Sequence, residues 1–304
     1  MIVTRPQDFL DAVSGGAIVA DLPATPRAAF LVSPIDFALA TESASDNRYM
    51  DLGDAPDPLH ALAEHAELAR RLAEDVPVMT FPGDPLAPDG VFPNNAFATA
   101  PGRLIVGHMR HAVRQRETAR ADIRAWFHEL LGREIVDLSG AALVAELTGS
   151  LVIDRARGIG YCGLGERCDL AGARAMHEAF GLRLTYCFEL AQGEYHTNVV
   201  LAILAGRVAL IAESGFRDSA DARAIASLYP DRALWLDAGQ KAAFAANAIC
   251  LAANRVWMSE RAARALSGTQ RAWLGERGFS IGSIPLDQIE KAGGSLRCCV
   301  AEIF

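Results

Sequence analysis

Apolar residues along the chain gather into short runs that come in pairs, and these pairs recur about every fifty residues. The runs are either continuously apolar or alternate with polar positions, and a turn containing Gly or Asn separates the two members of a pair. This pattern is typical of β-hairpins. The four clearest hairpins are predicted over Ala96–Met109, Ser150–Gly163, Asn198–Glu213 and Ala248–Met258.

A helical pattern and then one more short strand follow each predicted hairpin. Gly181, Pro230 and Gly278 come just after three of these helices, where residues that end a helix are expected. The predicted helix and strand pairs are Glu117–Leu131 with Ile135–Leu138, Leu170–Phe180 with Arg183–Phe188, Asp218–Leu228 with Ala233–Leu236, and Glu260–Arg277 with Phe279–Ile284.

The N-terminal part predicts a fifth unit, made of strand Ala28–Ser33, helix Pro58–Glu74 and strand Pro77–Phe81. Its hairpin is expected to be degraded into the loop 36–56. Five similar units at a steady period predict an α/β fold with radial repetition around a pseudo-symmetry axis. No Pro/Ser-rich linker interrupts the chain, so residues 1–304 are expected to form a single domain. The alternative is an ordinary α+β fold with coincidental spacing.

Composition narrows the functional classes. The chain has 304 residues, of which 51% are hydrophobic and 22% charged, and its formal net charge is −8. This charge argues against nucleic acid or an anionic membrane as the main partner. The six cysteines form no CxxC pair and no zinc-finger spacing, and the N-terminus lacks an apolar signal core. We therefore expect a cytoplasmic protein with reduced thiols. The sequence leaves open whether the protein forms a homo-oligomer.

Polar residues in apolar surroundings mark four segments that would enter the centre of a radial fold. They hold Asn94 and Asn95, then Glu146, then His196 and Asn198, and finally Cys298 after a Gly-Gly-Ser turn. A thiolate nucleophile needs a partner that shuttles protons, and a histidine with a near-neutral pKa suits that task. Each residue taken alone also has a purely structural interpretation, such as a turn asparagine or a buried histidine. Their combination favours catalysis.

These segments carry a resemblance to a known superfamily. Phe92–Phe97, Glu146–Asp154, His196–Val200 and Gly293–Cys298 occur in the order found in guanidino-group-modifying enzymes, which include arginine deiminases, dimethylarginine dimethylaminohydrolases, amidinotransferases and arginine dihydrolases. The chain is most similar to the citrulline- and arginine-hydrolase-like branch. The resemblance implies a five-bladed α/β propeller (pentein) of ββαβ repeats.

The resemblance also implies roles for individual residues. Cys298 would be the nucleophile, His196 the general acid and base, and Glu146 the associated carboxylate, with no metal and no organic cofactor. Asn95 and Asn198 stand where arginine deiminases carry aspartates that clamp the guanidinium. Amides bind a cation less strongly than carboxylates do but accept a neutral ureido group. This departure favours an arginine dihydrolase or a citrulline hydrolase that releases ammonia.

Substrate anchoring is harder to assign from the sequence. Arg110 could pair with the α-carboxylate of a guanidino or ureido amino acid, and Asn47, in the loop 36–56, could reach the same substrate. Within the class, dimethylarginine hydrolysis, deimination and amidino transfer stay open. The alternative from a different class is a non-enzymatic propeller that acts as a binding protein, because a fold alone does not fix a function.

Overall fold

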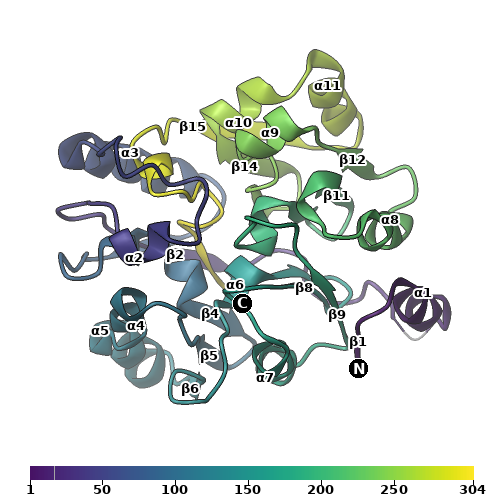
Figure 1. Cartoon of the computed structure of the whole chain (residues 1–304), viewed down its shortest axis with the longest axis horizontal. Helices are drawn as coiled ribbons and strands as arrows, with labels where there is room; N and C mark the ends of the chain where they lie inside the picture. The colour runs from purple at the N-terminus through teal and green to yellow at the C-terminus, as the bar shows by residue number, and fades with distance from the viewer. Residues whose placement is uncertain (17) are drawn as a thin grey trace.

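The computed structural model describes residues 1–16 and 18–304. Its strands form five small sheets arranged around a common centre, and the longer helices lie on the outside of this ring (Figure 1). In each sheet the middle strand pairs antiparallel with one neighbour and parallel with the other. A helical segment connects the two parallel strands. This architecture is the predicted five-bladed α/β propeller.

The blades are numbered here along the chain. Blade 1 contains β2 (Ala28–Val32), α3 (Pro58–Leu72), β3 (Val78–Phe81) and β16 (Ala301–Ile303). Blade 2 contains β4 (Phe97–Ala100), β5 (Arg103–Val106), α4 (Ala112–Thr118), α5 (Ala121–Ala125), a π-helical turn at Trp126–Leu130 and β6 (Glu134–Asp137). Blade 3 contains β7 (Leu151–Asp154), β8 (Ile159–Leu164), α7 (Leu170–Phe180) and β9 (Leu184–Glu189), to which β1 (Ile2–Val3) adds in parallel.

Blade 4 contains β10 (Leu201–Leu204), β11 (Val208–Ile211), α8 (Ser219–Ser227) and β12 (Ala233–Trp235). Blade 5 contains β13 (Ile249–Ala252), β14 (Arg255–Ser259), α10 (Glu260–Ala265), α11 (Gly268–Glu276) and β15 (Ser280–Ile284). The remaining helices are α1 (Pro6–Ser14), α2 (Thr41–Ala44), α6 (Leu147–Ser150) and α9 (Ala238–Ala242). Among the described residues, no helix has the length and apolarity that crossing a membrane requires.

Residues 36–56 form no hairpin, as expected, but the sequence did not indicate which strand completes the first unit. Its antiparallel partner does not come from the loop 36–56 but from β16, which aligns Ala301 with Phe30 of β2. The loop instead contains the single-turn helix α2, and its Leu52 is half exposed. A long polar segment cannot supply the buried face that an inner strand needs, whereas Ala301 and Ile303 are buried. The last strand therefore closes the ring.

Two predicted helices divide. The pattern over Glu117–Leu131 predicts one helix, but α4 ends at Thr118, α5 covers Ala121–Ala125 and a π-helical turn follows at Trp126–Leu130. The pattern over residues 260–277 predicts a continuous helix, but α10 ends at Ala265 and α11 begins at Gly268. Between them Ser267 is an N-cap, and its side chain and that of Gln270 form a capping box. Such a cap satisfies backbone donors that an uninterrupted helix would not expose, so it fixes a new helix start.

The inner strand of each blade is the one that faces the neighbouring blades, namely β16, β4, β7, β10 or β13. A short turn leads into each inner strand and places polar side chains at the centre. Three of these turns are helical, at Pro93–Asn95, α6 and Thr197–Val199. The hairpin turns lie at the far end of the inner strands, on the opposite face. The entry turns therefore define one face as the candidate active site.

Candidate active site

Four of the five entry turns contribute a buried polar or thiol side chain to the centre of the ring, and the fifth contributes a glycine. Asn95 precedes β4, Asn198 precedes β10, Asn247 precedes β13 and Cys298 precedes β16, and each is at most 2% exposed. Gly149, in α6, precedes β7. The sequence pattern predicted four of these five contributions. The structure brings them together from segments that lie up to two hundred residues apart.

The Cys298 thiol is surrounded by two amides. Its Sγ lies 3.3 Å from Nδ2 of Asn247 and 3.6 Å from Nδ2 of Asn198. The Asn247 amide is itself fixed, because it also donates to the backbone oxygen of Asn198 at 3.0 Å. Burial raises the pKa of Cys298, although the Ser295 backbone, these amides and Arg297 oppose the shift. These groups together favour the thiol over the thiolate.

His196 and Glu146 form a buried pair. His196 Nε2 lies 2.8 Å from Glu146 Oε2, and both side chains are completely buried. Burial alone would raise the pKa of Glu146, but Arg167, the His196 hydrogen bond and Arg114 outweigh it and hold the pKa well below its usual range. Burial lowers the pKa of His196, so a neutral imidazole faces an ionised carboxylate. The Nδ1 atom of His196 has no partner among the described residues.

Gly149 lets the backbone pass between Asn95 and His196. A Cβ atom added there would lie 2.7 Å from Cε1 and 2.8 Å from Nδ1 of His196, which is closer than any side chain tolerates. The amide of Asn95, oriented to satisfy its neighbours, donates to Oδ1 of Asn94 at 2.9 Å and accepts from Arg114 at 3.1 and 3.2 Å. The Asn94 side chain is buried, and its backbone oxygen accepts from Thr148. Both predicted asparagines thus belong to this centre.

Two buried arginines place positive charge beside the Glu146 carboxylate. Arg167 Nη1 lies 3.2 Å from Glu146 Oε2, and its Nη2 lies 2.5 Å from Oδ1 of Asp46 in the loop 36–56. Arg114 Nη1 lies 3.4 Å from Glu146 and binds both oxygens of Glu117, at 2.8 and 2.9 Å. Each guanidinium is at most 3% exposed. These are the cations nearest to the His196–Glu146 pair.

The predicted anchor Arg110 lies differently from what the sequence indicated. Its backbone N–H donates to Glu146 Oε1 at 3.2 Å, but its guanidinium turns outward, is 41% exposed and pairs with Asp46 and Glu166. Asn47 is buried against Gly293, to whose backbone oxygen its amide donates at 3.5 Å. Asn47 thus touches the turn that leads to the Cys298 thiol.

Sequence reasoning missed Asn247, Arg114 and Arg167. The repeat could have identified Asn247, because it stands immediately before the hairpin Ala248–Met258, as Asn198 does within its own unit. No comparable pattern marks the arginines. Arg114 lies on α4 and Arg167 in the β8–α7 turn, and only the closed ring makes them neighbours of Glu146.

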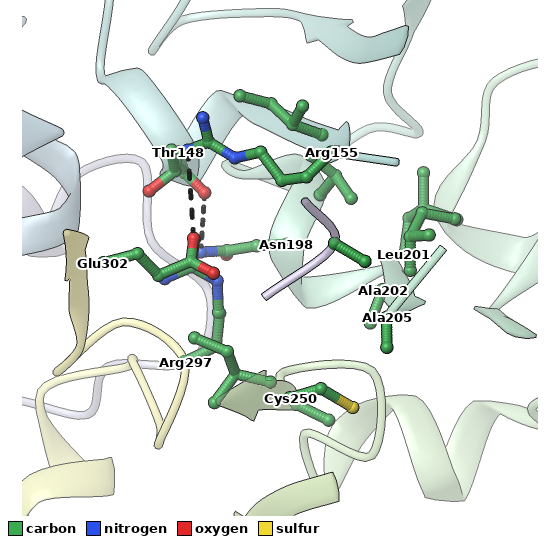
Figure 2. A pocket seen from close by; sticks show the side chains of 15 residues that line it. Thr148, Arg155, Asn198, Leu201, Ala202, Ala205, Cys250, Arg297 and Glu302 are labelled. Carbon is green, nitrogen blue, oxygen red and sulfur yellow. Dashed lines mark hydrogen bonds and ion pairs between the residues drawn. The ribbon is translucent and has the colours of Figure 1, made fainter. Parts of the chain in front are cut away.

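Asn198 and Thr148 also line a small hollow of about 40 Å³. Figure 2 shows Arg155, Arg297 and Glu302 on one side of it and Leu201, Ala202 and Ala205 on the other. Glu302 Oε2 lies 2.9 Å from Arg297 and 4.0 Å from Arg155. All six cysteines of the chain are free thiols.

Five ββαβ blades around a common centre are the architecture of the penteins, and the chain belongs to their guanidino-modifying superfamily. Residues 33–304 match the family model for N,N dimethylarginine dimethylhydrolase, eukaryotic. The protein is a member of this family and hence a hydrolase that acts on amidino C–N bonds. The non-enzymatic alternative is thereby excluded. No curated protein matches the chain in sequence.

Solved structures share the fold at low sequence identity. The N-terminal domain of ArgZ, an arginine dihydrolase from the ornithine-ammonia cycle in cyanobacteria, crystallised with substrate, is 22% identical with a TM-score of 0.80, and the match covers 91% of this chain and 97% of that one. AgrE with ornithine and NAD⁺ is 20% identical with a TM-score of 0.79, covering 91% and 39%. A dimethylarginine dimethylaminohydrolase adduct is 19% identical with a TM-score of 0.70, covering 91% and 100%.

Proposed function

We propose that the protein hydrolyses the guanidino or ureido group of an arginine-like amino acid through a covalent adduct on Cys298, and that it releases ammonia. The observation that carries this proposal is the surroundings of the thiol: its side-chain hydrogen-bond partners are the uncharged amides of Asn198 and Asn247. Amides donate to and accept from either a guanidinium or a neutral ureido group. An enzyme of this kind can process arginine twice or start from citrulline.

The proposed reaction steps use the buried His196–Glu146 pair together with the Cys298 thiol. The bound substrate cation stabilises the thiolate, and His196 takes the thiol proton. The Cys298 sulfur then attacks the guanidinium carbon, the C–N bond breaks, and His196 returns the proton to the leaving ammonia. Water, deprotonated by the same imidazole, displaces the sulfur and gives a ureido product. Glu146 keeps the imidazole oriented and stabilises its cationic form. A second round with water would give ornithine, carbon dioxide and another ammonia.

We propose a cation other than the predicted Arg110 as the anchor of the substrate α-carboxylate. Arg167 and Arg114 are buried beside Glu146, whereas the guanidinium of Arg110 faces the surface. We assign the anchoring role to Arg167, because its buried guanidinium lies beside Glu146 and contacts Asp46 of the loop 36–56. Bidentate pairing with a carboxylate suits a guanidinium. Asn95 would then contact the head group of the substrate.

A second candidate is dimethylarginine hydrolysis. It is favoured by the match of residues 33–304 to the dimethylarginine dimethylhydrolase family. The leaving group would be dimethylamine instead of ammonia, and citrulline would be the only amino acid product. Plain deimination of arginine would also end at citrulline but release ammonia.

The test is product analysis with purified protein given arginine, citrulline or dimethylarginine in separate reactions. Ornithine with two ammonia per arginine, or ornithine from citrulline, is the expected result. Citrulline as the final product would contradict the proposal and identify a deiminase or a dimethylaminohydrolase by the amine released. Cys298→Ala should abolish turnover, while Cys299→Ala removes a neighbouring buried thiol and should retain it. Full turnover by Cys298→Ala would disprove the covalent mechanism.

A further inference from the structure

A separate cavity of about 300 Å³ lies where the hairpin turns of blades 2 and 3 meet the N-terminal segment 22–27. Pro101 and Gly102 belong to the first of these turns and Gly158 to the second. Hairpin turns lie at the opposite end of the inner strands from Asn95 and Cys298. The cavity is therefore on the face away from the candidate active site.

Three arginines line this cavity, and its lining contains no carboxylate side chain. Arg27 has no ion-pair partner within 4.0 Å among residues 1–16 and 18–304. Arg133 donates only to the backbone oxygen of Ala100, at 3.3 Å. Arg155 reaches Glu302 only at 4.0 Å, while Glu302 is closer to Arg297. Among the side chains of residues 1–16 and 18–304, Glu302 is thus the one carboxylate within 4.0 Å of these three arginines.

The charges also act on one another. Burial and the nearby charge of Arg27 lower the pKa of Arg133. Burial, together with the charge of Arg297, lowers the pKa of Arg155 to about 10. Both shifts mean that the protein environment disfavours these cations as they stand. An anion placed between the guanidinium groups would remove this penalty.

The remaining walls are apolar and partly flat. Phe180, Leu182 and Phe304 line the cavity, and Leu22 and Ile153 complete these walls. The Arg155 guanidinium lies 4.1 Å from the ring centroid of Phe304 and 5.3 Å from that of Phe180. A flat apolar group is the natural neighbour of such stacked surfaces.

We propose that this cavity binds a small organic anion, with a carboxylate or phosphate held by Arg27, Arg133 and Arg155 and a flat apolar body against Phe180 and Phe304. A pocket that is mostly apolar with a few convergent charged groups is the usual form of a small-molecule site. The inference stands independently of the proposed catalytic function, because Arg27, Arg133, Phe180 and Phe304 lie away from the candidate active site, and only Arg155 also lines the small hollow beside Asn198.

The test uses isothermal titration calorimetry with three probes that share one ring system: 1-naphthoate, 1-naphthyl phosphate and the uncharged 1-naphthamide. We expect at least one anion to bind in a 1:1 ratio and at least tenfold more tightly than the amide. Its affinity should fall with ionic strength, as for a partly exposed charge interaction. Comparison of the two anions distinguishes a carboxylate site from a phosphate site.

Variants locate the binding. Arg133→Gln should weaken binding of the anion at least tenfold. Arg223→Gln, which removes the same charge from an exposed pair with Glu213 in blade 4, should leave it unchanged. If Arg133→Gln fails to fold, Arg27→Gln serves instead, because that side chain is exposed and unpaired in the described part of the chain. Equal binding of anion and amide, or equal effects of the cavity and control variants, would overturn the proposal.

Discussion

At Cys298, two opposing influences set the protonation state of the thiol. Burial raises the pKa, whereas the Asn247 and Asn198 amides, which donate toward sulfur, stabilise the thiolate. The neutral imidazole of His196 adds no positive charge. Thiolate is the reactive form, so reactivity is lost as the pH falls through this raised pKa. A cationic substrate would supply the missing charge only when it is bound.

Asn247→Ala should therefore make the thiol harder to ionise. A hydrogen bond to a charged group contributes about 1.5–3 kcal/mol, so the pKa of Cys298 should rise by about one unit and turnover should fall at least about tenfold. The rate of iodoacetamide alkylation measured across pH reports the pKa. Asn254→Ala, in an exposed hairpin turn, is the control. An unchanged alkylation profile would show that Asn247 only supports packing.

Arg167 and Arg110 should respond very differently to replacement by alanine. Removal of Arg167 leaves the fully buried carboxylate of Glu146 and the partly buried one of Asp46 without their main cation, and breaking a buried pair typically costs about 3–5 kcal/mol. We expect kcat/KM to fall by at least about a hundredfold. Removal of Arg110 deletes exposed pairs worth at most about 1 kcal/mol, so kcat/KM should change less than about fivefold. Steady-state kinetics of the two variants distinguish these outcomes. A large rise in KM for Arg110→Ala would instead identify Arg110 as the residue that anchors the substrate α-carboxylate.

The sequence could mark residues of the candidate site only where a local pattern carried them. Asn95, His196 and Cys298 stand at the entrances of predicted strands, so the repeat pointed to them. The buried partners of Glu146 depend on tertiary closure: Arg114 comes from a helix and Arg167 from a turn whose chain neighbours carry no distinguishing pattern. Side-chain direction was also beyond the sequence, as the outward guanidinium of Arg110 illustrates.

At the scale of elements, the helices were predicted well where caps and apolar periodicity agree. α7 has the predicted bounds Leu170–Phe180, and Gly181 ends it in the left-handed conformation with φ 63°. α3 starts at Pro58, after an Asp57 side chain that accepts from two backbone N–H groups. The failures occurred where polar local chemistry interrupts an apolar period, as at Ser267. A periodicity average does not detect such a cap.

His65 on α3 should make stability depend on pH. Its side chain is buried, and burial lowers its pKa to about 4, so it is neutral in the fold but protonates near pH 6.5 when unfolded. Its contribution is thus complete above pH 6.5 and is lost as the pH falls toward 4, about 3 kcal/mol in all. His65→Leu should remove about that much of the acid-induced loss in urea unfolding. His60→Leu, on the exposed face, should not, and identical losses in both variants would contradict the assignment.

At the scale of the whole molecule, the ring depends on contacts between β16 and both of its neighbouring strands. β16 pairs with β2, and the Thr99 hydroxyl on β4 donates to the Glu302 backbone oxygen and accepts from the Phe304 N–H, both at 2.9 Å. The steady period of the sequence predicted five units. The period could not predict that β16 is the inner strand of the first unit, because the pairing of β16 with β2 joins residues from opposite ends of the sequence.

Thr99→Val should test this closure. Valine keeps the shape but leaves two backbone groups unpaired, which should lower the free energy of unfolding by about 2 kcal/mol. Thr80→Val, on the exposed side of β3, should change it by less than about 0.5 kcal/mol. Denaturant unfolding provides the measurement. If both variants lose the same stability, the Thr99 bridge does not hold the ring closed.

The position of β16 has a consequence for protein synthesis. During synthesis β2 is made long before β16. Blade 1 therefore has an unpaired strand edge until residues 301–303 are made. An open edge invites pairing with other chains, and contacts between residues so distant in sequence form slowly. Cys298, the proposed nucleophile, reaches the centre with the segment that leads into β16. Under the proposed mechanism, a growing chain has no complete candidate site before β16 is made, and the pairing that completes blade 1 also brings the proposed nucleophile to the centre.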